Sequence, residues 1–221
     1  MVDDVLPTLE PGLTHLDSPG PRSTALHRVV VEECLERDGL VYWLDARNVA
    51  ASYALYELAP HRRALDGIRV ARAFTAYQHH TLARRLVRAV DGRTALVVAP
   101  NLASLYRDDD VPDYESEDLY AATATLLAGL GDTHDVPVLV TTDASGAALP
   151  PAIGDDAAEW SCERTQMGLR YAGAGGETQV YVKDGFWQTT IPYWVELFGR
   201  TRDLASPAAS PSPAPALADW S

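Results

Sequence analysis

The sequence predicts an α/β protein with a mostly parallel sheet, helices on both faces of that sheet, and a C-terminal antiparallel β extension. Between residues 13 and 142, short apolar runs of strand length alternate with segments of helical periodicity, the order typical of βαβ units. Between residues 161 and 193, strand-like runs follow one another with glycine-rich turns between them. A chain of 221 residues is long enough for one such domain with a buried core.

Three segments are predicted along the chain. Residues 1–12 form a short lead-in that contains two prolines, and residues 13–204 form the α/β core domain. Residues 205–221 are rich in alanine, serine and proline, a composition that predicts a disordered tail with polyproline II character.

The first unit is a strand, a tight turn containing proline and glycine, and a helix, all within residues 13–37. The helix begins near Ser23 and Thr24 and has one apolar stripe at helical spacing, formed by Leu26, Val29, Val30, Cys34 and Leu35. The apolar run 40–44 predicts a buried parallel strand that ends at Asp45.

The next elements follow the same alternation. Asn48 is the predicted N-cap of a helix at 49–58, and residues 68–73 form the following strand. Residues 94–98 form another buried strand. The helix between these two strands is capped by Thr75 and has an apolar stripe of Leu82, Leu86, Val87 and Val90.

An acidic loop, residues 108–117, leads into a helix with Leu119, Thr123, Leu126, Leu127 and Leu130 on one side. Residues 136–142 form a strand in which Pro137 must stand at the strand entrance or on an edge, because proline cannot donate to the hydrogen-bond ladder. The antiparallel extension is predicted from the runs 161–171, 178–183 and 188–193.

The chain is strongly acidic, with a formal charge of −13 and a pI near 4.7. Such a charge normally argues against a nucleic-acid partner. However, Lys183 is the only lysine against seventeen arginines, and aspartate outnumbers glutamate. This bias resembles proteins of salt-accumulating halophiles, in which an acidic surface serves solubility. The net charge therefore says less about partners than it would in an ordinary protein.

The two cysteines, Cys34 and Cys162, are isolated and lack the spacing of a zinc site or a disulfide framework. Residues 1–12 are acidic and have neither the basic nor the apolar region of a signal peptide, and no run approaches the ~18 apolar residues of a membrane span. The sequence predicts a cytoplasmic protein without a membrane segment and with no metal ligands.

The turn at the start of the first helix corresponds in position to a phosphate-binding loop, whose pattern is G-x-x-x-x-G-K-[ST]. On this pattern, Asp17 replaces the first glycine, Gly20 is kept inside the loop, and Arg22 replaces the second glycine. Ser23 stands at the lysine position and Thr24 keeps the hydroxyl. The turn retains the layout of the loop and lacks most of the groups that bind phosphate.

The order of these segments resembles the core of RecA/RadA recombinases, over about residues 9–198. The most specific stretch is IRVARAFTAYQHHTL, which is similar to the family's "V-A-R-A" strand and the helix after it. Five other stretches resemble the lead-in with phosphate loop and first helix, the second strand, the Walker B strand, the sensor strand and the closing hairpin: LEPGLTHLDSPGPRSTALHRVV, LVYWLDARN, TALVVAPNLASLYR, VPVLVTTD and TQVYVKDGFWQTTI.

The resemblance implies a RecA-like fold without the family's chemistry. Its Walker A lysine corresponds to Ser23, and the glutamate that polarises the attacking water corresponds to Arg47. The Walker B aspartate falls at or beside Pro100, and the neutral sensor amide corresponds to Asp143. Because phosphoryl transfer depends on positioned cations and a positioned water, these replacements predict no ATP hydrolysis and argue against binding of Mg-ATP or any other cofactor.

The loops that contact DNA in the family correspond to residues 107–117 and 144–159. Both are acidic here, so they argue against direct DNA binding through these loops.

Three other groups of residues each allow two interpretations. The pair His79 and His80 could belong to a metal site, but surface histidines are favoured because adjacent helix positions point about 100° apart. The aromatic cluster near the end of the chain is either a satellite core or a partner-docking patch, and it comprises Phe186, Trp187, Tyr193, Trp194 and Phe198. Trp220, after the tail, is either a docking residue or part of a frayed end, the latter being favoured.

The one basic region consists of arginines, namely Arg62, Arg63, Arg69, Arg72, Arg84, Arg85 and Arg88. It could be a surface for anions or a partner. A solvated helix face whose arginines pair with the abundant acids is the favoured interpretation.

The sequence therefore predicts a non-catalytic RecA/RadA-like paralogue, an accessory or scaffold in DNA recombination and repair whose partner is a recombinase or repair protein. One alternative is an atypical ATP-binding regulator or weak ATPase that uses Gly20, Arg22 and Thr24. Another is a scaffold reused in signalling or gene regulation, because fold does not determine function. The oligomeric state stays open.

Overall fold

The computed structural model describes residues 6–20, 23–109, 111–142, 148–166, 168–173, 176–183 and 186–189. All of these residues belong to one compact unit, Met1–Thr190. A second unit, Ile191–Ser221, lies outside the described residues.

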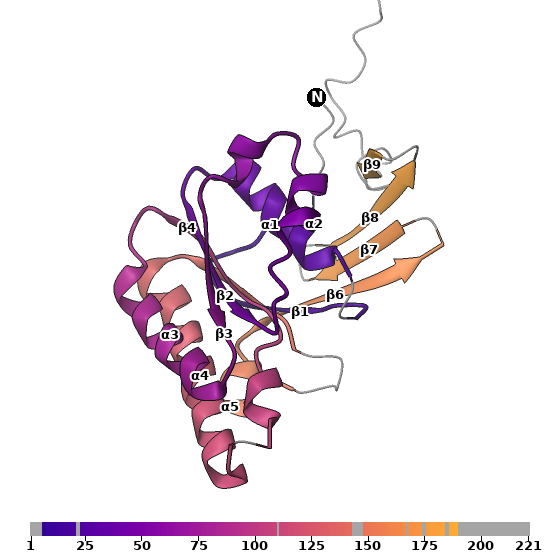
Figure 1. Ribbon diagram of the computed structural model, residues 1–221. Coiled ribbons are helices and arrows are strands. Elements are labelled where there is room, and N and C mark those ends of the chain that lie inside the picture. The colour runs from indigo at the N-terminus through magenta and orange to yellow at the C-terminus, as the bar shows by residue number, and fades with distance from the viewer. Residues whose placement is uncertain are drawn as a thin grey trace, which may run out of the picture. The chain divides into compact units, whose positions relative to one another are not determined.

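The sheet has nine strands in the order β3-β2-β4-β5-β1-β6-β7-β8-β9 (Figure 1). The strands from β3 to β6 pair in parallel, and the pairs from β6 to β9 are antiparallel. The α/β class with a C-terminal antiparallel extension is therefore confirmed. The strands are β1 (Gly12–Asp17), β2 (Leu40–Ala46), β3 (Ile68–Ala73), β4 (Thr94–Ala99), β5 (Pro137–Val140), β6 (Ala158–Thr165), β7 (Gly168–Gly173), β8 (Gly176–Lys183) and β9 (Phe186–Thr189).

Two groups of helices cover the sheet. Helices α1 (Ala25–Glu36) and α2 (Ser52–Leu58) lie on one face, and α3 (Ala76–Ala89), α4 (Asp113–His134) and α5 (Pro151–Gly154) lie on the other (Figure 1). Two short 3-10 turns, η1 (Arg62–Leu65) and η2 (Ser104–Arg107), follow α2 and β4. Each face has its own apolar cluster, because alternate strand residues point to opposite faces.

Strand β1 lies at the centre of the sheet, between β5 and β6. These three strands position part of the candidate site described below. His15 of β1 lies opposite Val140 of β5 on one side and Glu159 of β6 on the other. Helix α4 approaches β1 very closely, because a Cβ at Gly131 would lie only 2.7 Å from the Cα atom of Gly12. This contact needs glycine at position 131.

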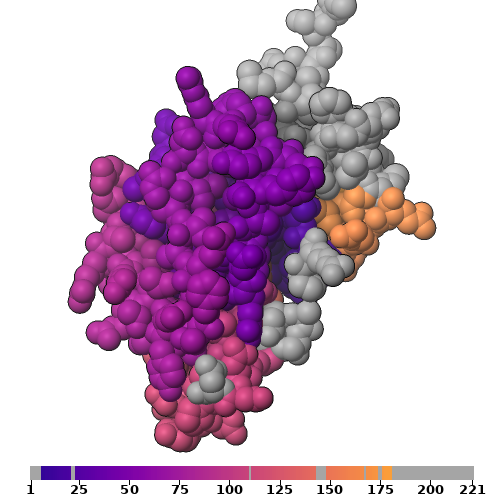
Figure 2. Space-filling model, viewed as in Figure 1, coloured from indigo at the N-terminus to yellow at the C-terminus, as the bar shows by residue number. Residues whose placement is uncertain are grey.

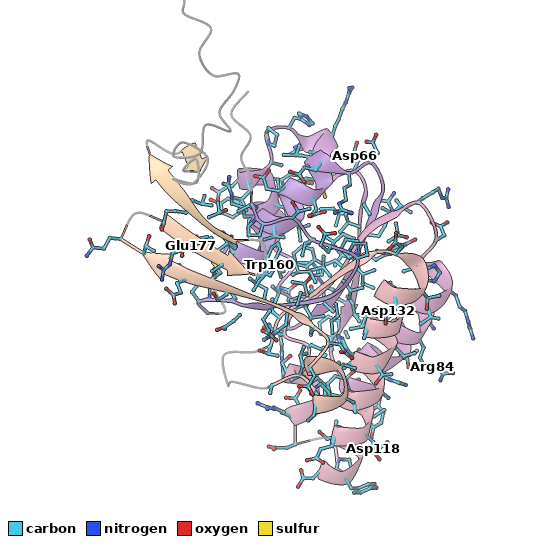
Figure 3. The ribbon with its side chains drawn as sticks, turned by 180° about the vertical axis from the view of Figure 1, so that it is seen from behind. Asp66, Arg84, Asp118, Asp132, Trp160 and Glu177 are labelled. Atoms are coloured by element: carbon cyan, nitrogen blue, oxygen red, sulfur yellow. The ribbon has the colours of Figure 1, made fainter. Side chains whose placement is uncertain are left out.

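Among the described side chains of the antiparallel extension, the buried apolar ones lie on one face. Five of these residues join the cluster under α1: Trp160, Cys162, Leu169, Tyr171 and Val180. The other face is polar, with Arg170 paired to Glu163 and, at 3.4 Å, to Glu177. Trp160 lies against Gly173, where a Cβ would come within 2.6 Å of the indole ring (Figure 3).

Several boundaries differ from the sequence-based prediction. The run 161–171 belongs to two strands, because the chain turns at Gln166 between β6 and β7. Asn48 is not a helix N-cap: it has a φ of 58°, and α2 begins only at Ser52. Pro137 is the first residue of β5, the strand entrance at which proline is tolerated, as predicted.

None of the helices in the described part of the chain has the length and apolar composition that crossing a membrane requires.

Candidate functional site at the carboxyl edge of the parallel strands

Ligands of open α/β sheets bind outside the carboxyl ends of the parallel strands, so this edge is the candidate site. It brings together the turn after β1, the loop after β2, the turn after β4 and the end of β5. Most of the residues predicted from the phosphate-loop and Walker patterns lie here.

The turn after β1 is described for residues 18–20 and, after a gap, from Ser23 onward. Asp17 is exposed at the end of β1, and Gly20 has a φ of 130°, which favours glycine. The Ser23 N–H donates to the Gly20 carbonyl at 3.0 Å, and the Ser23 hydroxyl accepts from the Ala25 N–H at 3.1 Å. Thr24 precedes α1 and makes no side-chain capping bond. The Ser23 hydroxyl thus satisfies one of the N–H groups that a phosphate would use at the helix start.

The first turn of α1 is packed against its neighbours. A ring nitrogen of His27, Nε2, lies 2.9 Å from the Val49 carbonyl, and its ring centroid lies 5.3 Å from that of Trp43. Burial lowers the pKa of His27, although the bond to Val49 and the nearby Asp45 charge oppose that shift. On the extension side, the Tyr171 hydroxyl donates to the Ala25 carbonyl at 3.0 Å. The helix start is therefore held by β2 and by β7.

Asp45, predicted at the functional edge of β2, is fully buried and holds the loop that follows. Its Oδ1 accepts the N–H groups of Val49 and Ala50 at 2.7 and 3.1 Å. Its Oδ2 accepts from Nε of Arg72 at 3.1 Å, and Arg72 also donates to the Ala50 carbonyl. Both carboxylate oxygens are thus engaged in holding β2, β3 and the β2–α2 loop together.

Arg47 is the residue that the sequence-based resemblance assigns to the position of the water-polarising glutamate. Its φ of 66° lies in the left-handed region, and its guanidinium donates to the Ser104 carbonyl at 2.9 Å and to the Asp108 carboxylate. The side chain therefore bridges the loop after β2 to the η2 turn after β4.

The turn after β4 is fastened to the end of β5. Pro100 is buried at the position expected for the Walker B aspartate, and Asn101 follows with a φ of 52°. The Asn101 N–H donates to the Thr141 hydroxyl at 3.0 Å, and the Leu102 N–H donates to the Thr141 carbonyl at 2.8 Å. The hydroxyl and the carbonyl of Thr141 are thus both engaged in hydrogen bonds with backbone N–H groups.

A cluster that the sequence analysis did not identify joins β1, β5 and β6. His15 Nδ1 lies 2.8 Å from Oε2 of Glu159, and His15 Nε2 lies 3.1 Å from Oγ1 of Thr142. The hydrogen-bonded sequence of carboxylate, imidazole and hydroxyl is the same as in the catalytic triad of serine hydrolases. In that triad, however, the carboxylate is buried. The Glu159 side chain is 62% exposed, so we assign this cluster to tethering the three strands.

A second polar cluster overturns the expectation that His79 and His80 lie on the surface. His79 is fully buried and its Nδ1 lies 2.8 Å from the Tyr106 hydroxyl, which donates to Thr123 at 2.7 Å. The half-buried His80 lies 2.9 Å from the same Thr123 hydroxyl. Burial lowers the pKa of His79 to about 4, and His80 adds to this shift. The chain of bonds joins α3, η2 and α4.

The remaining predicted residues are placed only in part. Phe186 and Trp187 lie in strand β9. Arg22, Asp143, Trp194 and Trp220 lie outside the described residues. Within the described ranges, no group of three or more His, Cys, Asp and Glu side chains is arranged to hold a metal ion.

No protein-family model matches the chain, and no curated protein matches it significantly. The geometry of the carboxyl edge is therefore the observation on which a function has to rest.

Proposed function

We propose that the protein is a non-catalytic RecA/RadA-like paralogue that serves as an accessory or scaffold in DNA recombination and repair. It acts through contacts with a protein partner, a recombinase or another repair protein. The observation that carries the proposal is the engagement of Asp45 and Arg47 in structural bonds at the strand ends where an ATPase needs free catalytic groups.

Mg-ATP requires a positively charged side chain near the phosphates and oxygen ligands for the metal. At the lysine position, Ser23 offers a hydroxyl that accepts a backbone hydrogen bond. Pro100 supplies no side-chain oxygen, and both oxygens of Asp45 are already bonded within the fold. The described residues do not fit Mg-ATP, and no catalytic step is assigned to them.

The fold supports a scaffold role in a second way. A mostly parallel sheet with an antiparallel extension is the architecture that the resemblance predicts, and its core is packed on both faces. The turns after β2 and β4 are held by hydrogen bonds, which suits a docking surface that loses little conformational entropy on binding.

The test is affinity capture of the tagged full chain from its own cells, in the host's salt and with nuclease added, followed by mass spectrometry. We expect a recombinase or repair protein, with recovery reduced when residues 205–221 are deleted or Trp194 is replaced by alanine. Recovery of signalling or gene-regulatory proteins instead would remove the DNA-repair assignment and favour a reused scaffold.

Calorimetry with Mg-ATP separates this proposal from an atypical ATP-binding regulator. We expect no saturable heat with the wild type. Saturable binding that disappears in Thr24→Ala, with the fold intact by circular dichroism, would overturn the non-catalytic proposal in favour of the nucleotide-binding regulator.

A further inference from the structure

The charge of this acidic chain is distributed unevenly. Residues 59–90 contain seven arginines and Asp66 as their single acidic residue, a formal charge of +6 within a chain of −13. This segment comprises η1, the edge strand β3 and helix α3. Figure 2 shows residues of this colour range covering one continuous face of the protein.

Six exposed arginines of this face form what we call the arginine band: Arg62, Arg63, Arg69, Arg84, Arg85 and Arg88. Arg72, the seventh, is excluded because it pairs with Asp45. Asp66 lies beside η1 and Arg84 lies on α3, so the two labels mark opposite parts of the band (Figure 3).

The arginine band is not neutralised by the chain's own acids. Within the described ranges none of its six members pairs with a carboxylate, in contrast to the favoured sequence-based interpretation. Arginines elsewhere do form such pairs: Arg28 with Glu32, Arg37 with Glu33, Arg47 with Asp108, Arg93 with Asp91 and Arg170 with Glu163. Unpaired arginines are therefore concentrated on one face of a protein that has an excess of carboxylates.

The helix part of the band points directly into solvent. Leu86 and the fully buried His79 and Ala83 mark the inward stripe of α3. At about 100° per residue, Arg84, Arg85 and Arg88 fall on the side of the helix opposite that stripe. Burial lowers the pKa of the half-buried His80, and the positive charge of Arg84 adds to this shift.

Aromatic rings are exposed within this segment and also in α2, which precedes it. Six of the eight exposed large hydrophobic side chains of the described residues lie between positions 53 and 87, and four of those six are aromatic: Tyr53, Tyr56, Phe74 and Tyr77. Phe74 is 70% exposed, and the Arg62 guanidinium lies 4.9 Å from the ring centroid of Tyr56.

We infer that this face binds single-stranded nucleic acid, with the arginines on the phosphates and exposed rings such as Phe74 against the bases. Guanidinium groups bind phosphate in a fork geometry, and bases stack on aromatic rings regardless of sequence. Nucleic-acid interfaces are much more positively charged than protein interfaces, whose centres are depleted of charged groups. Six exposed arginines without a carboxylate partner on one face therefore favour a nucleic acid over a protein as the ligand of this face.

The carboxyl edge carries exposed charges of both signs, because Arg47 and Arg107 are exposed there beside several acids. Exposed acids there include Asp17, Asp109, Asp113 and Glu159. Phosphates are attracted to the arginine band, which lies on η1, β3 and the C-terminal half of α3.

The test measures fluorescence anisotropy of a labelled oligothymidylate of about 30 nucleotides, long enough for several stacking positions. The full-length protein is titrated at KCl concentrations from about 0.1 M upward, so that screening varies. Circular dichroism at each concentration shows that the fold is present. The variant Arg84→Gln/Arg85→Gln/Arg88→Gln is compared with Arg93→Gln/Arg164→Gln/Arg170→Gln, which loses the same charge outside the band.

We expect saturable binding by the wild type and the control, and at least tenfold weaker binding by the α3 variant. The slope of log K against log salt should fall by about 2, since each single-strand phosphate contact contributes about 0.7. Phe74→Ala should weaken binding about fivefold or more through lost stacking.

Three outcomes would overturn the inference. The first is the absence of binding at the lowest salt, and the second is equal weakening of the two triple variants, which would indicate net charge alone. The third is evidence that the band binds something else. Such evidence would be binding of polyglutamate as tight as that of the oligonucleotide, or a dimer of the wild type in sedimentation velocity that is absent in the α3 variant. These experiments contain no protein partner, so their failure is separable from failure of the accessory role.

Discussion

Asp45 is fully buried, and its two oxygens accept hydrogen bonds from two backbone N–H groups and from Arg72. Replacement by alanine leaves the N–H groups of Val49 and Ala50 without an acceptor, and each buried unsatisfied donor costs about 1–3 kcal/mol. The residue therefore contributes to stability at a position where an enzyme of this architecture would place a reacting group.

We expect Asp45→Ala to lower the free energy of unfolding by about 3 kcal/mol, measured by urea denaturation. The matched control is Asp91→Ala, which removes an exposed carboxylate paired with Arg93 and should change stability much less than Asp45→Ala. Equal effects of the two substitutions would contradict the role assigned to Asp45.

His79 gives the protein a defined dependence on pH. Its pKa falls from 6.5 to about 4 on folding, so between these values the unfolded chain binds a proton that the folded chain does not. Stability contributed by the neutral ring is present above pH 6.5 and is lost as the pH falls towards 4.

For wild-type protein, this residue should account for a loss of about 3 kcal/mol across that range, and His79→Phe should reduce the slope of unfolding free energy against pH. Denaturation at several pH values measures the slope, and NMR of the His79 ring protons measures the pKa directly. A ring that titrates near 6.5 in the folded protein would rule out this account.

At the scale of elements, the packing of α4 on β1 depends on a glycine. Gly131 faces the backbone of Gly12, whereas Gly129, two residues earlier in the same helix, has open space around its Cα. The two positions share a helix and differ in what a methyl group would meet.

The two alanine substitutions should therefore have opposite signs. Gly131→Ala should destabilise the protein by about 2 kcal/mol through overpacking, and Gly129→Ala should stabilise it by up to about 1 kcal/mol through helix propensity. Thermal and urea unfolding give both values. A stabilising Gly131→Ala would show that α4 can move away from β1 at little cost.

Periodicity in the sequence was sufficient to predict the elements whose signal is local. The apolar runs of β2 and β4 and the stripe of α3 are examples. The turn at Gln166 was missed because the residues around it have strand character. Asn48 was misplaced because the loop after β2 is capped from inside by Asp45, which a capping pattern does not contain.

The site was harder to predict than the elements. The patterns identified Asp45 and Arg47 as strand-end positions, but their bonds to Arg72 and Asp108 depend on tertiary placement. The cluster of His15, Thr142 and Glu159 requires the register of three strands that are distant in sequence. Alternation along β1 could have shown only that His15 shares a face with Leu13.

For the whole molecule, net charge opposes compaction. A formal charge of −13 produces self-repulsion that added salt screens. We expect the urea midpoint to rise as KCl increases from about 0.05 M to about 1 M, with the largest change at the low end, where the screening length shortens most. A midpoint that stays constant would mean that the acidic surface is already neutralised by local pairing.

The charge pattern also separates two properties of the molecule. The arginine band lies on η1, β3 and α3, whereas Asp45 and Arg47 hold turns at the carboxyl ends of other strands. Substitutions in the band should therefore alter binding of polyanions without affecting the turns that Asp45 and Arg47 hold.

The one-sided burial of the antiparallel extension limits how the protein can be shortened. A chain that ended before β6 would leave β1 with an unpaired edge and would uncover the apolar surface beneath Trp160 and Tyr171. Such an edge beside an apolar patch is a template for aggregation. Fragments made for expression or crystallisation should therefore keep the extension through β8.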